Sequence, residues 1–370
     1  MIEDLGWSKA QFAMLGSLSL INAFFFPVAG RLADVFGVKR AVMLGVIVLP
    51  LAFIGYSLMS GPVWQYVALQ LATGFLCVTT TTTVYSRVAV EHVTRARGLA
   101  LAIVASGPAI TGALGTPIVN WLVETHGWRA TYHAMAAFAA LSAVITLLLL
   151  PSGGPVAGDS RLRKRRLRDD YPVIFRSSVF WLMVVAMLAC NLPQIVAMSQ
   201  LKMILMGKGI APQSTSMMIS AVPLGVLAGR FVSGYALDRF PSHIVGFFGM
   251  VIPSFGLALL ATSLNAHALL TLAAFCLGFS VGAEGDIVAF VVARKFGVEI
   301  FSSVMGLLTM AISLSVALGA AILSLTLKLT GEFHAFIAIC SVTVFVGGVL
   351  FLFIGRAPVP APSTSHAPST

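Results

Sequence analysis

Eleven stretches of about 20 predominantly apolar residues follow one another along this chain of 370 residues. A stretch of that length crosses the hydrocarbon core of a bilayer as a helix, because a helix pairs its own backbone groups where no water can do so. The sequence therefore predicts an all-α membrane protein whose transmembrane helices cover residues 10–32, 41–59, 64–85, 99–119, 130–150, 179–206, 215–237, 244–263, 269–292, 304–327 and 335–354.

Composition excludes the soluble classes of protein. Only 10% of the residues are charged and 58% are hydrophobic, whereas a soluble domain uses about a quarter charged residues. The net charge of +10 arises from bases in short connections between apolar stretches, a pattern that indicates membrane topology and not nucleic-acid binding. The four cysteines lie inside apolar stretches, so no disulfide framework or zinc site is predicted.

The lysines and arginines also predict the orientation. When the connections are assigned alternately to the two sides of the membrane, most bases fall on one side, which the positive-inside rule makes the cytoplasmic one. We therefore expect a multi-pass protein of the cell membrane, the inner membrane if the source is bacterial. Its C-terminus would be cytoplasmic and its N-terminus would lie outside.

The longest connection carries six bases between Arg161 and Arg168 and divides the chain into two similar halves. Residues 28–36 align with residues 232–240 at an offset of about 204 residues, and Val, Gly, Asp and Phe coincide. At a slightly larger offset, Gly98-Leu99 aligns with Gly306-Leu307. We predict an N-terminal half of five helices, a basic cytoplasmic linker, a C-terminal half of six helices and a disordered tail, at residues 1–150, 151–171, 172–356 and 357–370.

One motif carries a family resemblance. Gly30-x-Leu32-Ala33-Asp34-x-x-Gly37-x-Lys39-Arg40 resembles a loop motif of the major facilitator superfamily of secondary transporters, and residues 234–239 resemble its degenerate copy. The resemblance implies a bundle of twelve helices in two pseudo-symmetric halves. The first of these helices is missing here, and we expect in-frame codons upstream of Met1 to encode it. It also implies a conformational latch, formed by Gly30, Asp34, Lys39, Arg40, Asp238 and Arg239. The alternative is that these residues form a static salt bridge.

Shorter motifs resemble particular branches of that superfamily. Residues 4–8, 95–101 and 127–129 resemble the monocarboxylate porters and the oxalate/formate exchangers. The lysine that the exchangers carry in their eleventh helix has no counterpart in residues 304–327, which argues against oxalate exchange. The antiporter motif of the fifth helix is present only in part, as Gly107-Pro108 with Gly112 and Gly115, which argues against drug efflux.

Three charged residues lie deep in predicted spans, where each charge costs about 3 kcal/mol or more. Arg230 resembles the arginine of monocarboxylate porters that binds the substrate carboxylate, but Val226 stands where those porters have an acidic partner. Glu284 and Asp286 are about 200° apart around one helix, so we expect one to balance a buried base such as Arg230 and the other to be a proton site. The alternative is that both belong to structural ion pairs.

Polar residues near these charges complete the candidate site. Pro193 interrupts a predicted span, and Asn191 and Gln194 beside it are candidate substrate-binding donors, with a simple kink as the alternative. Tyr85 and Arg87 are expected at the cytoplasmic mouth, where Arg87 either gates or extends toward the interface. The row of threonines at residues 79–83 is expected mostly to bond its own helix backbone.

These residues predict a monomeric secondary transporter that moves small organic anions, monocarboxylates in the first place, by alternating access. It would be either proton-coupled or facilitative, with substrate, protons and the lipid bilayer as its partners. No catalytic constellation, metal site, cofactor motif or nucleic-acid motif is found in the sequence. The alternatives are an exporter of apolar or cationic compounds, and a non-transporting sensor or truncated remnant.

Overall fold

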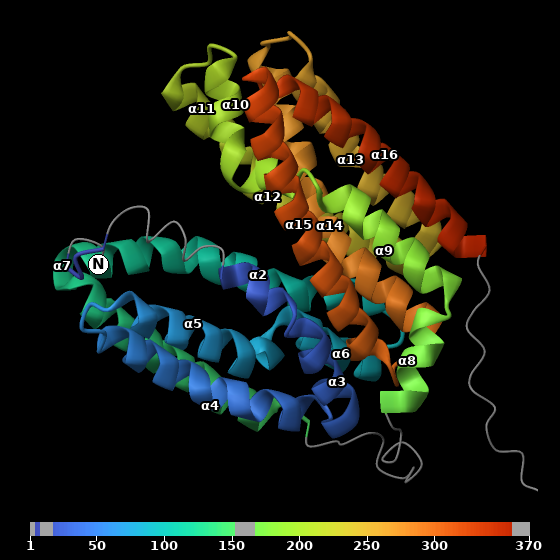
Figure 1. Cartoon of the computed structure of the whole chain (residues 1–370). Coiled ribbons are helices and arrows are strands. Elements are labelled where there is room, and N and C mark those ends of the chain that lie inside the picture. The colour runs from blue at the N-terminus through green and yellow to red at the C-terminus, as the bar shows by residue number, and fades with distance from the viewer. Residues whose placement is uncertain (1–3, 8–17, 152–166, 357–370) are drawn as a thin grey trace, which may run out of the picture. The chain divides into compact units, whose positions relative to one another are not determined.

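The computed structural model describes residues 4–7, 18–151 and 167–356, and the regular elements in these ranges are all helices (Figure 1). The middle of the predicted basic linker and the predicted disordered tail lie outside the described residues. The prediction of an all-α membrane protein is confirmed.

Eight helices of the described ranges are long and apolar enough to cross a membrane, and they contain nine of the eleven predicted spans. Helix α7 (Arg97–Leu149) contains two of these spans, because Gly127 with φ of 80° breaks it in the middle. Two more of these nine spans, Ser178–Gly207 and Pro212–Arg239, each consist of successive helices. The spanning elements are α4 (Val38–Ser57), α7, α9 (Ser178–Asn191) with η3 (Val196–Gln200) and α10 (Leu201–Gly207), α11 (Pro212–Ile219) with α12 (Ala221–Arg239), α13 (Ser242–Ala261), α14 (His267–Phe296), α15 (Phe301–Thr330) and α16 (His334–Arg356).

The other two predicted spans, 10–32 and 64–85, are interrupted in their described parts, and residues 10–17 lie outside the described residues. Residues 18–36 form α2 (Leu18–Ala23) and α3 (Phe26–Phe36), and residues 63–92 form α5 (Val63–Leu76), η1 (Val78–Thr80) and α6 (Thr82–His92). At η1, the hydroxyls of Thr80 and Thr81 donate to Cys77 O at 2.6 Å and Val78 O at 2.9 Å. Threonines that bond the preceding turn often bend helices, and these two bonds lie at the break. The predicted backbone bonding is confirmed for these two threonines.

The described residues group into two compact units, and the boundaries between the units divide α6, α7 and α15. The first unit contains the described parts of Met1–Val88, Gly107–Arg165 and Glu299–Met310, and the second those of Ala89–Ser106, Arg166–Val298 and Ala311–Thr370. This grouping follows contacts and not the sequence repeat, so the predicted borders of the two halves remain a prediction.

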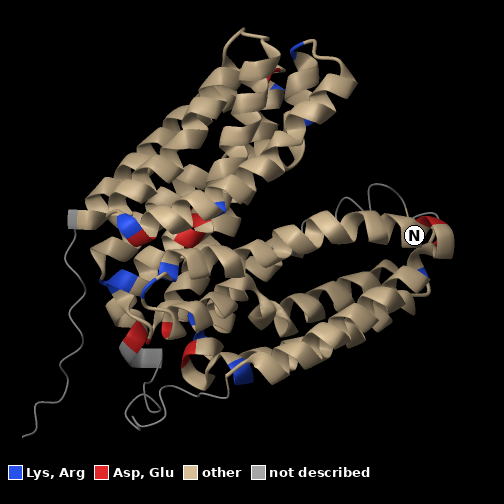
Figure 2. Cartoon of the chain, turned by 180° about the vertical axis from the view of Figure 1, so that it is seen from behind, with Lys and Arg blue, Asp and Glu red and all other residues tan. Residues whose placement is uncertain are grey.

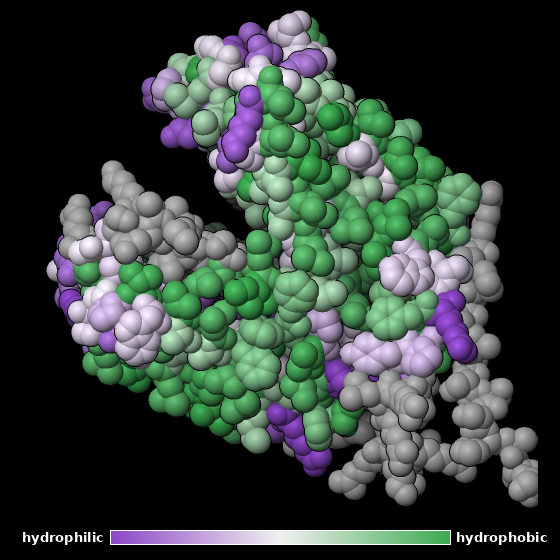
Figure 3. Space-filling view, in the orientation of Figure 1, coloured by the Kyte–Doolittle hydropathy of each residue, from purple (hydrophilic) through white to green (hydrophobic). Residues whose placement is uncertain are grey.

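Side chains are distributed as a bilayer requires. Lysine, arginine, aspartate and glutamate gather mostly toward helix ends, and long middle stretches of the helices are free of them (Figure 2). Apolar side chains cover much of the visible surface (Figure 3), and Leu148, Leu149 and Leu329 are each 77% exposed. Such exposure is unfavourable in water and suits contact with lipid chains.

In the second unit, α12 packs along α14, and α13 packs against α14 and α16. Glycines allow α12 and α14 to approach closely: a Cβ atom on Gly229 would lie 2.0 Å from Phe279 O, and one on Gly282 would lie 2.0 Å from Val226 O. Small residues spaced by four are the usual means of bringing membrane helices into backbone contact. This close pair of helices carries the three deep charged residues.

Candidate functional site

Arg230 and Asp286 lie on facing helices, each close to one of the glycine contacts. Arg230 follows Gly229 on α12 and is half-buried, and Asp286 lies one turn after Gly282 on α14 and is 1% exposed. The charge of Arg230 acts on Asp286, yet the two side chains form no direct ion pair. Arg230 Nε and Asp286 Oδ2 are buried without a hydrogen-bond partner within the described part of the chain.

This arrangement leaves hydrogen-bonding capacity unused deep in the bundle. An unpaired buried donor or acceptor costs about 1–3 kcal/mol, and more when it is charged. A guanidinium group is a planar fork that binds a carboxylate through two N–H groups. Arg230 can therefore bind an anion whose carboxylate replaces or supplements the nearby Asp286.

Glu284 has a different partner. Asn191 Nδ2 donates to Glu284 Oε1 at 2.6 Å and to Met187 O at 3.0 Å, so α9 and α14 are joined by one buried amide. Glu284 is 8% exposed and Asn191 is 1% exposed. The proline at 193 explains why Asn191 ends α9, because proline cannot donate the backbone hydrogen bond that continues a helix.

A small cavity of mixed polar and apolar lining adjoins this pair. It has a volume of about 20 Å³, enough for about one water molecule, and its polar lining includes Asn191, Gln194, Ser280 and Glu284. A buried carboxyl beside a space that can hold a water molecule can exchange a proton without an adjacent cation. Asn191 and Gln194, expected to bind substrate together with Arg230, are grouped with Glu284 instead.

Glu284 and Asp286 thus lie on separate faces of α14 and have different neighbours. Glu284 is paired with Asn191 of α9, and Asp286 lies in the field of Arg230 of α12. Their angular separation of about 200° on the helix accounts for this division. No acid stands at position 226 of α12 itself, and the acid whose charge acts on Arg230 is Asp286 of α14.

Asp34 forms the centre of a buried polar contact in the first unit. Its carboxylate accepts hydrogen bonds from the backbone N–H groups of Ser302 at 3.0 Å and Ser303 at 2.6 Å, in the first turn of α15. Arg87 forms an ion pair with the same carboxylate, and the two side chains are 6% and 1% exposed. Helix N-termini favour anions, so Asp34 both caps α15 and neutralises Arg87.

The second unit repeats this contact. Asp238 accepts hydrogen bonds from Gly98 N at 2.8 Å and Leu99 N at 3.1 Å, in the first turn of α7. The glycines of the motif match as well, because Gly30 lies against the backbone of Ser302 and Gly234 against that of Gly98. Gly98 is therefore equivalent to Ser302, at the offset of 204 residues that relates Asp34 to Asp238. The alignment of Gly98 with Gly306 is corrected accordingly.

The other predicted latch residues lie elsewhere. Lys39 Nζ donates to Leu150 O at 3.0 Å, Arg40 is exposed, and the Arg239 guanidinium lies 4.4 Å from the centre of the Tyr235 ring. The base that joins Asp34 is Arg87, which was expected at the cytoplasmic mouth. Tyr85, expected beside it, is half-buried.

Sequence reasoning missed one cluster in the first unit. Trp128 Nε1 donates to Asp4 Oδ2 at 2.7 Å, and Trp7 Nε1 donates to Gly61 O. Trp7 and Trp128 belong to one buried aromatic cluster with Tyr56 and Met59. The two motifs that carry a family resemblance, at residues 4–8 and 127–129, therefore meet through Asp4, Trp7 and Trp128. Their shared Gly-Trp pair was the signal that could have joined them.

The chain is similar to known proteins over most of its length. The family model of the Major Facilitator Superfamily matches residues 1–282 and 194–369. Monocarboxylate transporter 13 of Bos taurus is 24% identical over 372 residues, which are 95% of this chain and 83% of the relative. Citrate exporter 1 of Yarrowia lipolytica is 31% identical over 168 residues, 44% of this chain and 24% of the exporter.

A solved structure shares the fold. The fucose:proton symporter of E. coli superposes with a TM-score of 0.73 at 14% identity, over 93% of this chain and 92% of the symporter chain. These relatives are transporters and not enzymes, in agreement with the expectation drawn from the residues.

Proposed function

Because the chain belongs to the Major Facilitator Superfamily of transporters, we propose that it is a secondary carrier of small organic anions, monocarboxylates in the first place. It moves them by alternating access and couples their movement to protons. The names of its relatives support the substrate class, since one is a monocarboxylate transporter and another is a citrate exporter.

Arg230 is the observation that carries the proposal. It is half-buried, and its Nε has no hydrogen-bond partner in the described part of the chain. It lies on the helix pair that holds the other deep charges. A base at this depth costs about 3 kcal/mol or more, and a substrate carboxylate repays part of that cost each time it binds. A cation exporter would gain nothing from such a residue.

Asp286 allows the carrier to change conformation without bound substrate. Without substrate, Arg230 would remain in the bundle as an uncompensated charge, and the conformational change would be expensive. Asp286 is near enough to stabilise that charge but makes no direct ion pair that a substrate would have to break. Asp286 therefore stabilises the guanidinium from a distance in the empty carrier, and the substrate carboxylate binds it directly in the loaded one.

Glu284 is the proposed proton site. It is buried beside a neutral amide and a small cavity, and it is grouped with no base in the described residues that surround it. A carboxyl in such surroundings is favoured in its protonated form, because burial penalises charge. Conformational change that admits water would release the proton.

The test is uptake of labelled short-chain carboxylates into liposomes that contain the full-length protein. Arg230→Lys keeps the charge but loses the planar fork, so we expect the apparent affinity for carboxylate to fall about tenfold or more. Arg176→Lys is the matched control, because Arg176 is an exposed arginine outside the α12–α14 pair. Undiminished carboxylate uptake by Arg230→Ala would refute the proposal.

A further inference from the structure

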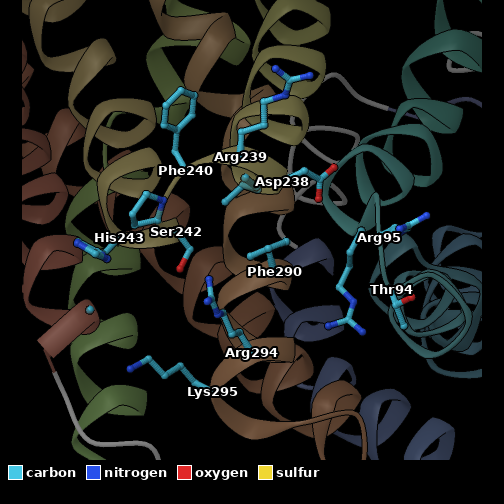
Figure 4. Close-up of a pocket in the computed structure, with 14 residues that line it drawn as sticks. Thr94, Arg95, Asp238, Arg239, Phe240, Ser242, His243, Phe290, Arg294 and Lys295 are labelled. Carbon is cyan, nitrogen blue, oxygen red and sulfur yellow. The ribbon is translucent and has the colours of Figure 1, made fainter.

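A second site lies at the ends of α12 and α14, on the side where most bases are predicted. An open pocket of about 740 Å³ lies in the second unit, lined by Thr94, Arg95, Arg97, residues 237–243, Phe290, Arg294, Lys295 and Gly355. Figure 4 shows side chains from these separate segments, including Arg95, Ser242 and Arg294, arranged around the same space. The pocket is distinct from the Arg230–Asp286 pair and from the Glu284 cavity.

The charges that line this pocket are unbalanced. Five bases line it, namely Arg95, Arg97, Arg239, Arg294 and Lys295, and the one acid in the lining is Asp238. The Asp238 carboxylate is already engaged by the N–H groups of Gly98 and Leu99. The lining therefore holds an excess of positive charge that an anionic ligand would neutralise.

Arg95 and Arg294 are the two bases available to such a ligand. Two others are engaged, because Arg97 donates to Val93 O at 3.1 Å and to Val90 O at 3.0 Å, and Arg239 stacks on Tyr235. Arg95 and Arg294 are both exposed, and no hydrogen bond or ion pair involves their side chains in the described ranges. They come from different segments and can bind one anion from two directions.

We propose that this pocket binds a phosphate group. A phosphate offers several acceptor oxygens, so it can be shared by two guanidinium groups and the Ser242 hydroxyl, whereas a carboxylate is satisfied by one fork. Leu237, Phe240 and Phe290 add apolar surface to the same pocket. That combination of bases and apolar side chains fits a phospholipid headgroup with the start of its acyl chains.

The position of the pocket favours a lipid over a soluble phosphate. It lies where α12 and α14 end, at the depth of lipid headgroups, and anionic lipids of the cytoplasmic leaflet attract bases there. Phe240 is 58% exposed, as expected for a side chain that meets lipid. A bound phosphate would join Arg95, which precedes α7, to Arg294 of α14, and so reinforce the hydrogen bonds between Asp238 and the first turn of α7.

The experiment measures binding and not transport, so it succeeds or fails independently of the proposed carrier function. Thermal unfolding of the purified full-length protein is followed with added short-chain phosphatidylglycerol, phosphatidylcholine or inorganic phosphate. We expect phosphatidylglycerol to raise the unfolding midpoint, and Arg95→Gln with Arg294→Gln to weaken its apparent binding about tenfold or more. Arg176→Gln, which removes an exposed arginine outside the pocket, is the control.

Each outcome decides the question. Stabilisation by phosphatidylglycerol alone supports a lipid headgroup, and stabilisation by inorganic phosphate as well supports a soluble phosphate ligand at the same arginines. If the double variant binds phosphatidylglycerol as the native protein does, or if Arg176→Gln weakens binding equally, the site is overturned. The second result would mean that the effect comes from overall positive charge.

Discussion

At the scale of single residues, Glu284 permits a test of proton coupling. Glu284→Gln keeps an oxygen that can accept the hydrogen bond from Asn191 Nδ2, but it cannot release a proton. We expect this variant to lose carboxylate accumulation driven by a pH gradient and to retain exchange of labelled for unlabelled substrate. Both are measured in the same liposomes. Accumulation at the native rate would show that the proton is carried elsewhere.

Asp286 should respond differently, because it lies in the field of Arg230. Asp286→Asn removes the negative charge that competes with the substrate, so carboxylate should bind more tightly and the apparent KM should fall. The empty carrier would then return more slowly, since Arg230 lacks its partner. Net uptake should therefore decrease more than exchange. An unchanged KM would separate Asp286 from the substrate site.

At the scale of elements, the contact between α12 and α14 depends on glycine. Gly282→Ala would place a Cβ atom 2.0 Å from Val226 O, so the two helices must move apart. We expect a loss of about 1–3 kcal/mol of stability, measured as a lower thermal unfolding midpoint in detergent. Gly285→Ala lies on the same helix with nothing within 4 Å of its Cβ position, and it serves as the control. Equal midpoints for the two variants would argue against close packing.

At the scale of the whole molecule, the repeat appears as two equivalent contacts. Asp34 caps α15, Asp238 caps α7, and the two sets of partners differ by the same 204 residues. The two contacts differ in burial and charge, because Asp34 also holds the buried Arg87 whereas Asp238 is exposed.

Because of that difference, substitution of Asp34 should lower the stability of the protein more than substitution of Asp238. Asp34→Asn breaks a buried ion pair and should cost about 3 kcal/mol of stability. Asp238→Asn weakens a helix cap and should cost about 1 kcal/mol. Thermal unfolding of both variants in the same detergent measures the difference. A larger loss for Asp238→Asn would contradict the assignment of Arg87 to the first contact.

The sequence by itself determined the class of fold and the places where charge is expensive. Both properties are local: an apolar stretch must be long enough to cross a bilayer, and a charge inside it is unfavourable wherever the other helices lie. The motif around Asp34 and its copy around Asp238 could be found in the same way, because similar segments can be aligned without coordinates.

Only the tertiary structure decided which of these residues meet. That Glu284 is bonded to Asn191, that Asp286 lies near Arg230 and that Asp34 holds Arg87 depends on how each helix is rotated and how closely its glycines let it approach a neighbour. A residue's own stretch of sequence contains neither quantity. The basic pocket was hidden for the same reason, since its arginines belong to segments that are far apart in the chain and adjacent only after α7, α12 and α14 have packed together.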